Sequence, residues 1–404
     1  MIKLQDIFPE SEKTVNKVLV ALLALVVFFL PFKFLVNLFI VLALITWLAG
    51  NPFKALFTKN KFTKCLLAIL VFYLLHAIAF FYTNNIEESF FSLEIKISLL
   101  IFPLIFYTEN YTWHQMKFFV RSFVLGNLLC CLLCLGHAGY LTLTEEKNYF
   151  FYQDLSWFQH PSYFSMYLTF SSVALLQKKI FTRLQNLLCL VIFTLFILLL
   201  SSKTGITIHF LFLLMVGVAY FLGKGNYLKV ALFALASGLV LFLLVYFVPP
   251  VKERFQNVVR AFDSDKTDKS ATESTAVRML IWQEAKKIIK KKPLLGVSPG
   301  DANDALYASY KEHGLTGAYE KKLNAHSQYF QTGVGLGFVG LTSLLAMFIL
   351  PFFQKPRKLL VFFLLISAVN FLTESMLQTM AGCIFFGYFY ALLCFDKELN
   401  PKKF

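Results

Sequence analysis

Long apolar runs alternate with short polar breaks along most of the chain. An α-helix that crosses the hydrocarbon core of a bilayer needs about 20 apolar residues, and most of the runs are close to that length. The longest polar stretch follows the ninth run. The pattern predicts about twelve membrane-spanning helices, with boundaries that are soft by several residues. They lie near residues 16–32, 34–50, 63–83, 91–108, 116–140, 162–177, 184–201, 205–222, 228–248, 327–350, 357–373 and 375–395.

Composition supports the same fold class. Of the 404 residues, 58% are hydrophobic and only 15% are charged, whereas soluble domains carry about 25% charged residues. The 48 phenylalanines are spread through the chain, which excludes a soluble enzyme with a single anchor. We predict an all-α polytopic membrane protein with a large loop between helices nine and ten. Its expected parts are nine helices in 1–248, a loop domain in 249–326, and three helices with a tail in 327–404.

Lysine and arginine gather in alternate breaks, as the positive-inside rule predicts for cytoplasmic loops. This predicts cytoplasmic termini, a periplasmic loop domain and a bacterial inner-membrane location. The net charge of +15 then has a topological cause, and we expect no nucleic-acid partner. The first run lacks a small-x-small cleavage site, so we expect a retained helix. The basic breaks contain Lys3, Lys13, Lys17, Lys54, Lys59, Lys61, Lys64, Lys117, Arg121, Lys178, Lys179, Arg183, Lys224, Lys229, Lys355, Arg357, Lys358, Lys397, Lys402 and Lys403.

The predicted loop domain contains an amphipathic helix. It opens with Pro249, Pro250 and a polar stretch that is typical of an exposed loop. The segment AVRMLIWQEAKKIIKKK then has apolar residues at helical spacing, with Thr275 available as an N-cap and Pro293 as a stop. Its apolar side can rest on the membrane domain or on membrane lipid, while its lysines meet anionic groups.

Neither a metal nor another cofactor is expected. All seven cysteines lie inside apolar runs, where cysteine behaves as a small hydrophobe. Cys131, Cys134 and His137 have a metal-like spacing but no fourth ligand, so helix packing is the better interpretation. Lys96 is the one charge that could lie deep in a predicted span, and we interpret it as snorkelling to the interface.

Polar clusters fall on the predicted periplasmic side, at the ends of different helices. The first contains His160 and Tyr163 around Pro161, where simple helix capping is the alternative. The second is Ser202-Lys203-Thr204, a short turn rich in hydroxyls and donors that suits phosphate oxygens. Lys203 could instead snorkel to the interface.

Two further clusters lie in and after the loop helix. Arg278 and Trp282 share a helix face, and a guanidinium suits a pyrophosphate better than an ammonium does; a solvated surface arginine is the alternative. His326 could act as a general base for an acceptor hydroxyl. Asn324 and Gln328 flank His326. Glu374 lies between the last two spans, where a charged side chain costs free energy, and it could orient His326 or pair with Arg278 or Lys203. The glycines at 333, 335, 337 and 340 permit close helix approach.

These motifs, in this order, resemble the O-antigen ligase and O-antigen polymerase superfamily of bacterial membrane glycosyltransferases. The resemblance rests on the long loop before the tenth helix and on four short strings. They are His160-Pro161-x-Tyr163-Phe164, Ser202-Lys203-Thr204-Gly205, Arg278-x-x-x-Trp282 followed by Pro293-Leu-Leu-Gly296, and Asn324-Ala-His326-Ser-Gln-Tyr with the glycine run.

The resemblance implies a GT-C-like enzyme that moves a glycan from undecaprenyl pyrophosphate to a hydroxyl of the lipid A core oligosaccharide. It needs no metal or nucleotide sugar and acts on the periplasmic face with inversion. Arg278 and Lys203 would bind the pyrophosphate, with Ser202, Thr204, His160, Tyr163 and Trp282 around it, and His326 would activate the acceptor. Many relatives have arginine where Lys203 stands. Lysine keeps the positive charge but cannot make the bidentate hydrogen bonds of a guanidinium.

Other functions remain open at this level. A polymerase of O-antigen or exopolysaccharide repeat units needs the same donor site and differs only in its acceptor, which could be another glycan. A protein O-glycosyltransferase is a further option. A transporter of lipid-linked oligosaccharide should show internal repeats and midplane charges, whereas the polar clusters here lie at helix ends. A non-catalytic envelope scaffold would tolerate loss of His326 and Arg278.

Overall fold

The structure is a computed structural model that describes residues 4–10, 12–52, 63–177, 180–247, 269–270, 275–354 and 356–395. Several sequence predictions fall outside these residues, among them Pro249, Pro250 and most of the polar stretch before 275. The same holds for the basic residues Lys3, Lys54, Lys59, Lys61, Lys178, Lys179, Lys355, Lys397, Lys402 and Lys403.

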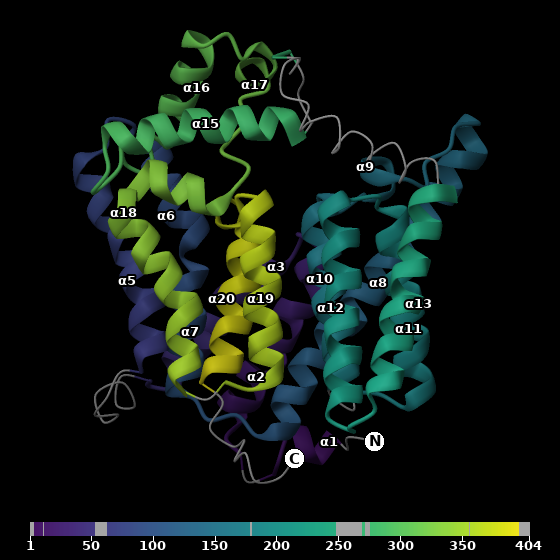
Figure 1. The fold of residues 1–404 in the computed structure, drawn as a ribbon. Helices are drawn as coiled ribbons and strands as arrows, with labels where there is room; N and C mark the ends of the chain where they lie inside the picture. The colour runs from purple at the N-terminus through teal and green to yellow at the C-terminus, as the bar shows by residue number, and fades with distance from the viewer. Residues whose placement is uncertain are drawn as a thin grey trace.

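The described residues form a bundle of helices with a helical cap at one end (Figure 1). The bundle helices are α1 (Leu4–Ile7), α2 (Thr14–Phe29), η1 (Leu30–Phe32), α3 (Val36–Ala49), α5 (Lys64–Ala79), η2 (Phe80–Tyr82), α6 (Ile86–Lys96), α7 (Ser98–Thr108), α8 (Trp113–Glu145), α9 (Tyr152–Leu155), α10 (Pro161–Gln177), α11 (Arg183–Leu199), α12 (Lys203–Leu222), α13 (Tyr227–Phe247), α18 (Gln328–Ile349), η4 (Leu350–Gln354), α19 (Lys358–Thr373), η5 (Met376–Gln378) and α20 (Met380–Cys394). The cap helices are α15 (Thr275–Lys291), α16 (Ala302–Glu312) and α17 (Thr316–Glu320).

A helix lies over each range that the apolar runs predicted. Among the described residues, six helices are long and apolar enough to cross a membrane by length and hydropathy, and four shorter helices are also apolar. Their side chains that face outward are large and apolar, as on α3 and α11. The chain is therefore a multi-pass membrane protein. The count of twelve spans, the three-part division and the side of the membrane on which the cap lies stay predictions.

Lys96 corrects the sequence interpretation. It is 0% exposed at the end of α6, where its ammonium donates to the hydroxyl of Ser92 at 2.9 Å. The lysine cannot snorkel, because α5 and α20 pack against α6 on either side. The backbone stays helical from α6 into α7, with Ile97 at φ −59° and ψ −27°.

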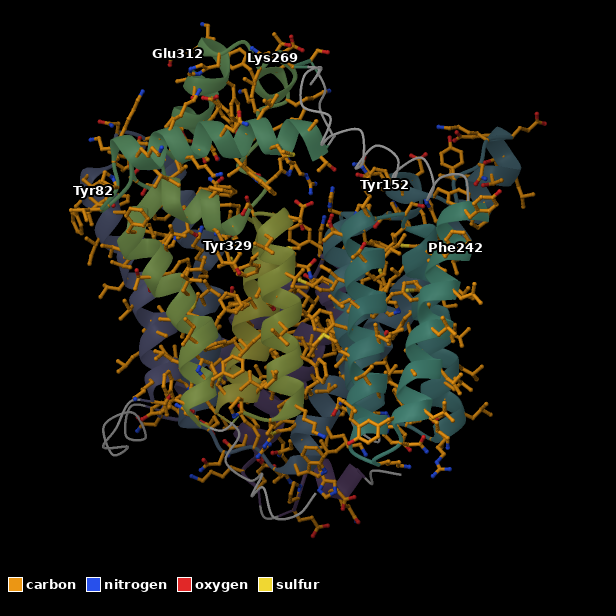
Figure 2. The ribbon with its side chains drawn as sticks, in the orientation of Figure 1. Tyr82, Tyr152, Phe242, Lys269, Glu312 and Tyr329 are labelled. Carbon is orange, nitrogen blue, oxygen red and sulfur yellow. The ribbon has the colours of Figure 1, made fainter. Side chains whose placement is uncertain are left out.

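The cap has its own apolar core, which α15 forms with α16, α17 and the start of α18. Val277, Ile281, Leu306 and Tyr310 are each at most 3% exposed in it. Figure 1 shows α15 lying across the end of the bundle, opposite to α1. Figure 2 shows Glu312 and Lys269 at the outermost part of the cap, farthest from the bundle. We call this end of the molecule the cap end.

Two joints fix the cap to the bundle. The Asp301 carboxylate is 9% exposed and accepts hydrogen bonds from the backbone N–H groups of Asn84, at 3.0 Å, and Asn85, at 2.9 Å. Both donors lie just before α6, where the N-terminal end of a helix favours a negative charge. Beside them, at the edge of the bundle (Figure 2), the Tyr82 hydroxyl donates to the Leu295 carbonyl at 3.0 Å.

The second joint is a backbone seam between residues 293–299 and α18. The chain kinks inside α18 at Gly337, whose φ is 59°. There the Phe338 N–H donates to the Pro293 carbonyl at 2.7 Å, and a Cβ on Gly337 would lie 2.4 Å from the Leu294 carbonyl oxygen. A side chain cannot occupy that space.

The seam refines the prediction made for the glycine run. Gly333 does allow helix approach, since a Cβ there would meet the Ile289 side chain of α15 at 2.7 Å. Gly335 and Gly337 instead face the 293–299 segment, which forms turns and is not a helix. The Pro293-Leu-Leu-Gly296 string and the glycines are therefore two sides of one contact.

Candidate active site

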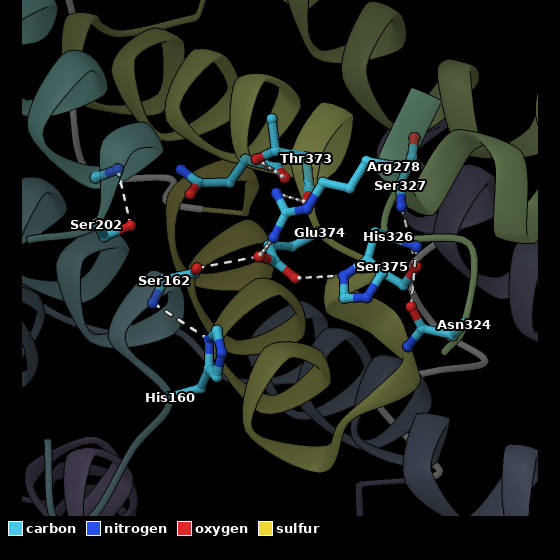
Figure 3. A network of polar contacts seen from close by, with 12 residues as sticks. His160, Ser162, Ser202, Arg278, Asn324, His326, Ser327, Thr373, Glu374 and Ser375 are labelled. Atoms are coloured by element: carbon cyan, nitrogen blue, oxygen red, sulfur yellow. Dashed lines mark hydrogen bonds and ion pairs between the residues drawn. The ribbon is translucent and has the colours of Figure 1, made fainter. Parts of the chain in front are cut away.

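A buried carboxylate organises the cap end of the bundle. Glu374 follows the last residue of α19 and is 6% exposed. Its Oε1 accepts from the guanidinium Nη2 of Arg278 at 2.9 Å and from the hydroxyl of Ser162 at 3.0 Å, and its Oε2 lies 3.6 Å from Nδ1 of His326 (Figure 3). Side chains from the cap, from α10 and from the segment before α18 thus meet on one acid.

Arg278 reaches down from α15 with its head partly exposed. Besides its ion pair with Glu374, its Nη1 donates to the Thr373 carbonyl at the end of α19 at 2.9 Å. A guanidinium has five N–H donors in a fixed plane, and these two contacts use two of them. The remaining donors can bind an anion while the first two hold the side chain in place.

His326 sits in a short turn whose backbone is held on several sides. Its φ is 45°, an uncommon value for a residue with a side chain. Its N–H donates to Oδ1 of Asn324 at 2.9 Å, and the next N–H, of Ser327, donates to the Ser375 hydroxyl at 3.2 Å. The imidazole is 23% exposed. The turn fixes the ring beside Glu374 and leaves part of it open.

Trp282 supports this turn from the cap. It lies one helical turn after Arg278 on α15, and its indole N–H donates to the Ala325 carbonyl at 3.0 Å. Its ring also stacks on Phe330 of α18, with centroids 5.6 Å apart. The shared helix face predicted for Arg278 and Trp282 therefore delivers both to the same site, and the indole N–H of Trp282 is already used in positioning His326.

Gln328 joins α18 to the turn that carries Glu374. Its N–H donates to the Glu374 carbonyl at 3.2 Å, and its side-chain Oε1 accepts from the Leu377 N–H at 2.7 Å. The chain direction after Glu374 is set by these two bonds. Gln328 is fully buried, so its contribution is to geometry.

Electrostatics favour the charged form of Glu374. Burial raises the pKa of this carboxyl, but the imidazole of His326 and the guanidinium of Arg278 outweigh it and bring the pKa to about 2. Opposite charges and donated hydrogen bonds stabilise the carboxylate more than desolvation destabilises it. Glu374 is therefore an anion at neutral pH, and the pair with Arg278 is balanced in charge.

The start of α10 brings His160 and Tyr163 to the cap end. Pro161 occupies the first helical position, where no N–H is needed, and the Ser162 N–H donates to Nδ1 of His160 at 3.4 Å. His160 thus caps the helix, and its ring is exposed. Tyr163 is buried in the helix beneath, with its ring edge-on to His160.

The Ser202-Lys203-Thr204 turn begins α12. Ser202 is the N-cap, and its hydroxyl accepts from the Gly205 N–H at 3.2 Å. A Cβ on Gly205 would lie 2.3 Å from the hydroxyl of Ser165 on α10, so only glycine permits this close approach. Lys203 and Thr204 are partly exposed at the first turn. The turn is packed on the helix that carries Ser162, and its binding of phosphate stays a prediction.

Three residues that sequence reasoning did not single out complete the site. They are Ser162, which donates to Glu374; Ser375, which accepts from the N–H beside His326; and Gln331, whose Oε1 accepts from the Ala325 N–H at 2.9 Å. The signal for Ser162 and Ser375 was their place next to residues already chosen. Gln331 lies inside an apolar run, where its amide is costly unless it has a partner.

Fold and site together define a multi-pass membrane protein with an arginine, a histidine and a buried carboxylate at one end of its helix bundle. No group of three or more His, Cys, Asp or Glu residues in the described part of the chain has a metal-binding arrangement.

Comparison with known proteins points to one family. Residues 188–345 match the family model described as O-antigen ligase. The matched range contains Lys203, Arg278 and His326, so the resemblance drawn from those motifs is confirmed. No curated protein matches the chain. The match supports a membrane glycosyltransferase of the ligase or polymerase kind, acting on lipid-linked glycans.

Proposed function

We propose that the chain is a ligase that transfers a glycan from undecaprenyl pyrophosphate to a hydroxyl of the lipid A core oligosaccharide, on the periplasmic face of the inner membrane. The observation that carries the proposal is the convergence on the buried Glu374 of Arg278 and His326, which both lie in the range that matches the O-antigen ligase model. That match supports the reaction class. The donor, the acceptor and the roles below are the proposal.

Arg278 stabilises the leaving group in this mechanism. As the glycosidic bond to the pyrophosphate breaks, negative charge grows on the phosphate oxygens, and a fixed cation lowers the barrier most when it needs no reorganisation. Arg278 is already held by Glu374 and the Thr373 carbonyl, with further N–H donors available. We assign Lys203, in the turn packed against α10, a second contact to the same oxygens.

His326 acts as the general base. With a proton on Nδ1 directed toward Glu374 Oε2, the Nε2 atom carries the lone pair that accepts the acceptor hydroxyl's proton. The present separation of 3.6 Å is longer than a hydrogen bond, and such contacts often tighten only when substrate is bound. The acceptor oxygen attacks the anomeric carbon opposite the pyrophosphate, which inverts the configuration.

Glu374 couples the two roles. It holds Arg278 with one oxygen and faces His326 with the other, so the positions of leaving group and base are set by one side chain. When His326 takes the proton, the imidazolium forms beside a carboxylate, which stabilises it. Neither step requires a metal or another cofactor.

Complementation of a strain that lacks the gene tests the function. Wild type, Arg278→Ala and His326→Ala are expressed at matched membrane levels, and the surface glycan is resolved on a gel. His114, which is exposed in the first turn of α8, serves as the control, as His114→Ala. We expect wild type and the control to restore ligated glycan, and the two site variants to accumulate lipid-linked polymer and bare core.

The same gel separates the competing reactions. A strain without the protein that carries core with a single repeat unit would identify a polymerase. Loss of glycan from a surface protein with normal lipopolysaccharide would identify a protein O-glycosyltransferase. Full activity of both site variants would contradict the assigned mechanism.

A further inference from the structure

A pocket opens at the cap end of the bundle, beside the candidate active site. It lies between η1, the start of α3 and the start of α20, and its volume is about 220 Å³. The polar residues in its lining are Lys33, Asn37 and Thr379, and the remaining lining residues are apolar. A cavity with apolar walls and a few polar groups at one side suits a ligand with an apolar body and a polar head.

Lys33 is held at this pocket by an unusual backbone. Its φ is 65° and that of Leu35 is 61°, so two of three successive residues occupy the left-handed region without being glycine. Such conformations persist only where the surroundings enforce them. Gln159 donates to the Leu30 carbonyl at 3.1 Å, and the rings of Phe32 and Phe158 pack 5.3 Å apart, which anchors the turn on both sides.

The ammonium of Lys33 has no hydrogen-bond or ion-pair partner in the part of the chain that the structure describes. Lys33 is also in a break between the first two predicted spans, on the side where the other short breaks are poor in lysine and arginine. A positive charge on that side departs from the pattern that sets topology. An anionic ligand would account both for its position and for its lack of a partner among the described residues.

The pocket is continuous with the elements that build the active site. Gln159, which anchors η1, is followed directly by His160 and the start of α10. On the other wall, Thr379 follows η5, the short helix that comes directly after Glu374 and Ser375. A molecule in the pocket therefore lies next to the carboxylate cluster.

We propose that this pocket binds the lipid end of the diphosphate donor. The first prenyl units lie against Leu30, Val36 and Ile384, and Lys33 contacts the phosphate attached to them. The second phosphate, which bears the glycan, then extends toward Arg278. This inference rests on the proposed function. A phospholipid has the same combination of phosphate and apolar chain, but it gives no reason for the pocket to adjoin the carboxylate cluster.

Binding of undecaprenyl pyrophosphate without a glycan tests the proposal. The full chain is placed in phosphatidylcholine nanodiscs, and the dissociation constant is measured for wild type, Lys33→Ala, Lys33→Arg and Ala381→Phe. Lys147→Ala is the matched control, because it removes an exposed lysine from the loop after α8. We expect about tenfold weaker binding for Lys33→Ala, since a charge-assisted contact is lost. Lys33→Arg and Lys147→Ala should bind as wild type does, and Ala381→Phe, which fills the pocket, should bind more weakly.

Each other outcome overturns a distinct statement. Equal binding by wild type, Lys33→Ala and Ala381→Phe, with Arg278→Ala weakened, overturns the pocket while the proposed function stands. Failure of wild type to bind undecaprenyl pyrophosphate overturns both. If phosphatidylglycerol in the nanodisc abolishes the difference between wild type and Lys33→Ala, the occupant is a bulk anionic phospholipid, and the assigned donor is wrong.

Discussion

At the scale of single residues, the site is a set of polar groups gathered around one buried acid, Glu374. A carboxylate in a low-dielectric interior is costly unless it is paired and hydrogen-bonded, and Glu374 has Arg278, Ser162 and His326 around it. Sequence alone could mark Glu374 and His326, which stand in polar breaks beside apolar runs, and Arg278, which lies in the polar loop helix. It could name Arg278, Lys203 and His326 as possible partners of Glu374 but could not choose among them, because Arg278 and Glu374 are 96 positions apart.

Replacement of Glu374 by glutamine separates its charge from its shape. Glu374→Gln keeps the size and an acceptor oxygen for Ser162, but it leaves Arg278 without a counter-ion and His326 without an orienting anion. We expect the transfer rate to fall by about 100-fold, because the base His326 loses the anion that orients it and stabilises its imidazolium form. Single-turnover rates at saturating donor measure this. Exposed Glu87 provides the control as Glu87→Gln, and a wild-type rate in Glu374→Gln would refute the role of the charge.

Glu374 also links stability to acid. Its folded pKa of about 2 lies below the ordinary value of 4.5 because His326 and Arg278 outweigh the effect of burial. The stabilisation is therefore complete above about pH 4.5 and is lost as the pH falls toward 2, by about 3 kcal/mol in all. Thermal unfolding in detergent between these pH values should show a steeper loss for wild type than for Glu374→Gln. Parallel curves for the two proteins would contradict this linkage.

At the scale of elements, the helices were predictable and their junctions were not. Apolar runs bounded by polar breaks fix where a helix can lie, and each predicted range contains one. The burial of Lys96 at the junction of α6 and α7 depends on α5 and α20, which pack against α6. The kink at Gly337 could not be predicted either, because a glycine in a sequence does not show its φ. These features arise from packing between distant segments.

The seam between the cap and α18 gives a prediction at this scale. Gly337→Ala places a Cβ where the Leu294 carbonyl lies and forces a left-handed backbone on alanine, so we expect the free energy of unfolding to fall by about 1–3 kcal/mol. Gly136→Ala is the control, since α8 is regular there and nothing lies within 4 Å of an added Cβ. It should be neutral or slightly stabilising. The melting temperature of the detergent-solubilised protein measures both, and equal values would show that the seam tolerates a side chain.

At the scale of the whole molecule, the cap end and the opposite end differ in chemistry. The site and the cap lie at one end, and α1 lies at the other (Figure 1). The charge pattern of the sequence predicts that the end with the site and the cap is periplasmic. Periodicity and charge could predict this arrangement, but not that the cap carries its own core or that it is fixed to α18 and to the start of α6, because those contacts are tertiary.

Accessibility in intact cells tests the orientation. Lys311→Cys places a thiol on exposed α16 of the cap, and Lys13→Cys places one just before α2. A membrane-impermeant maleimide should label Lys311→Cys in spheroplasts and should label Lys13→Cys only after lysis. The native cysteines are largely buried, and the unsubstituted protein sets the background. Labelling of Lys13→Cys alone before lysis would mean that the cap faces the cytoplasm.

The most direct test of the central claim is glycan transfer by the purified protein. Wild type and His326→Ala are compared with an undecaprenyl-pyrophosphate-linked glycan as donor and lipid A core as acceptor, and donor binding is measured alongside. If His326 is the base that works beside Glu374 and Arg278, His326→Ala should bind donor as wild type does but transfer glycan at least about 100-fold more slowly. Transfer at the wild-type rate by His326→Ala would contradict the account.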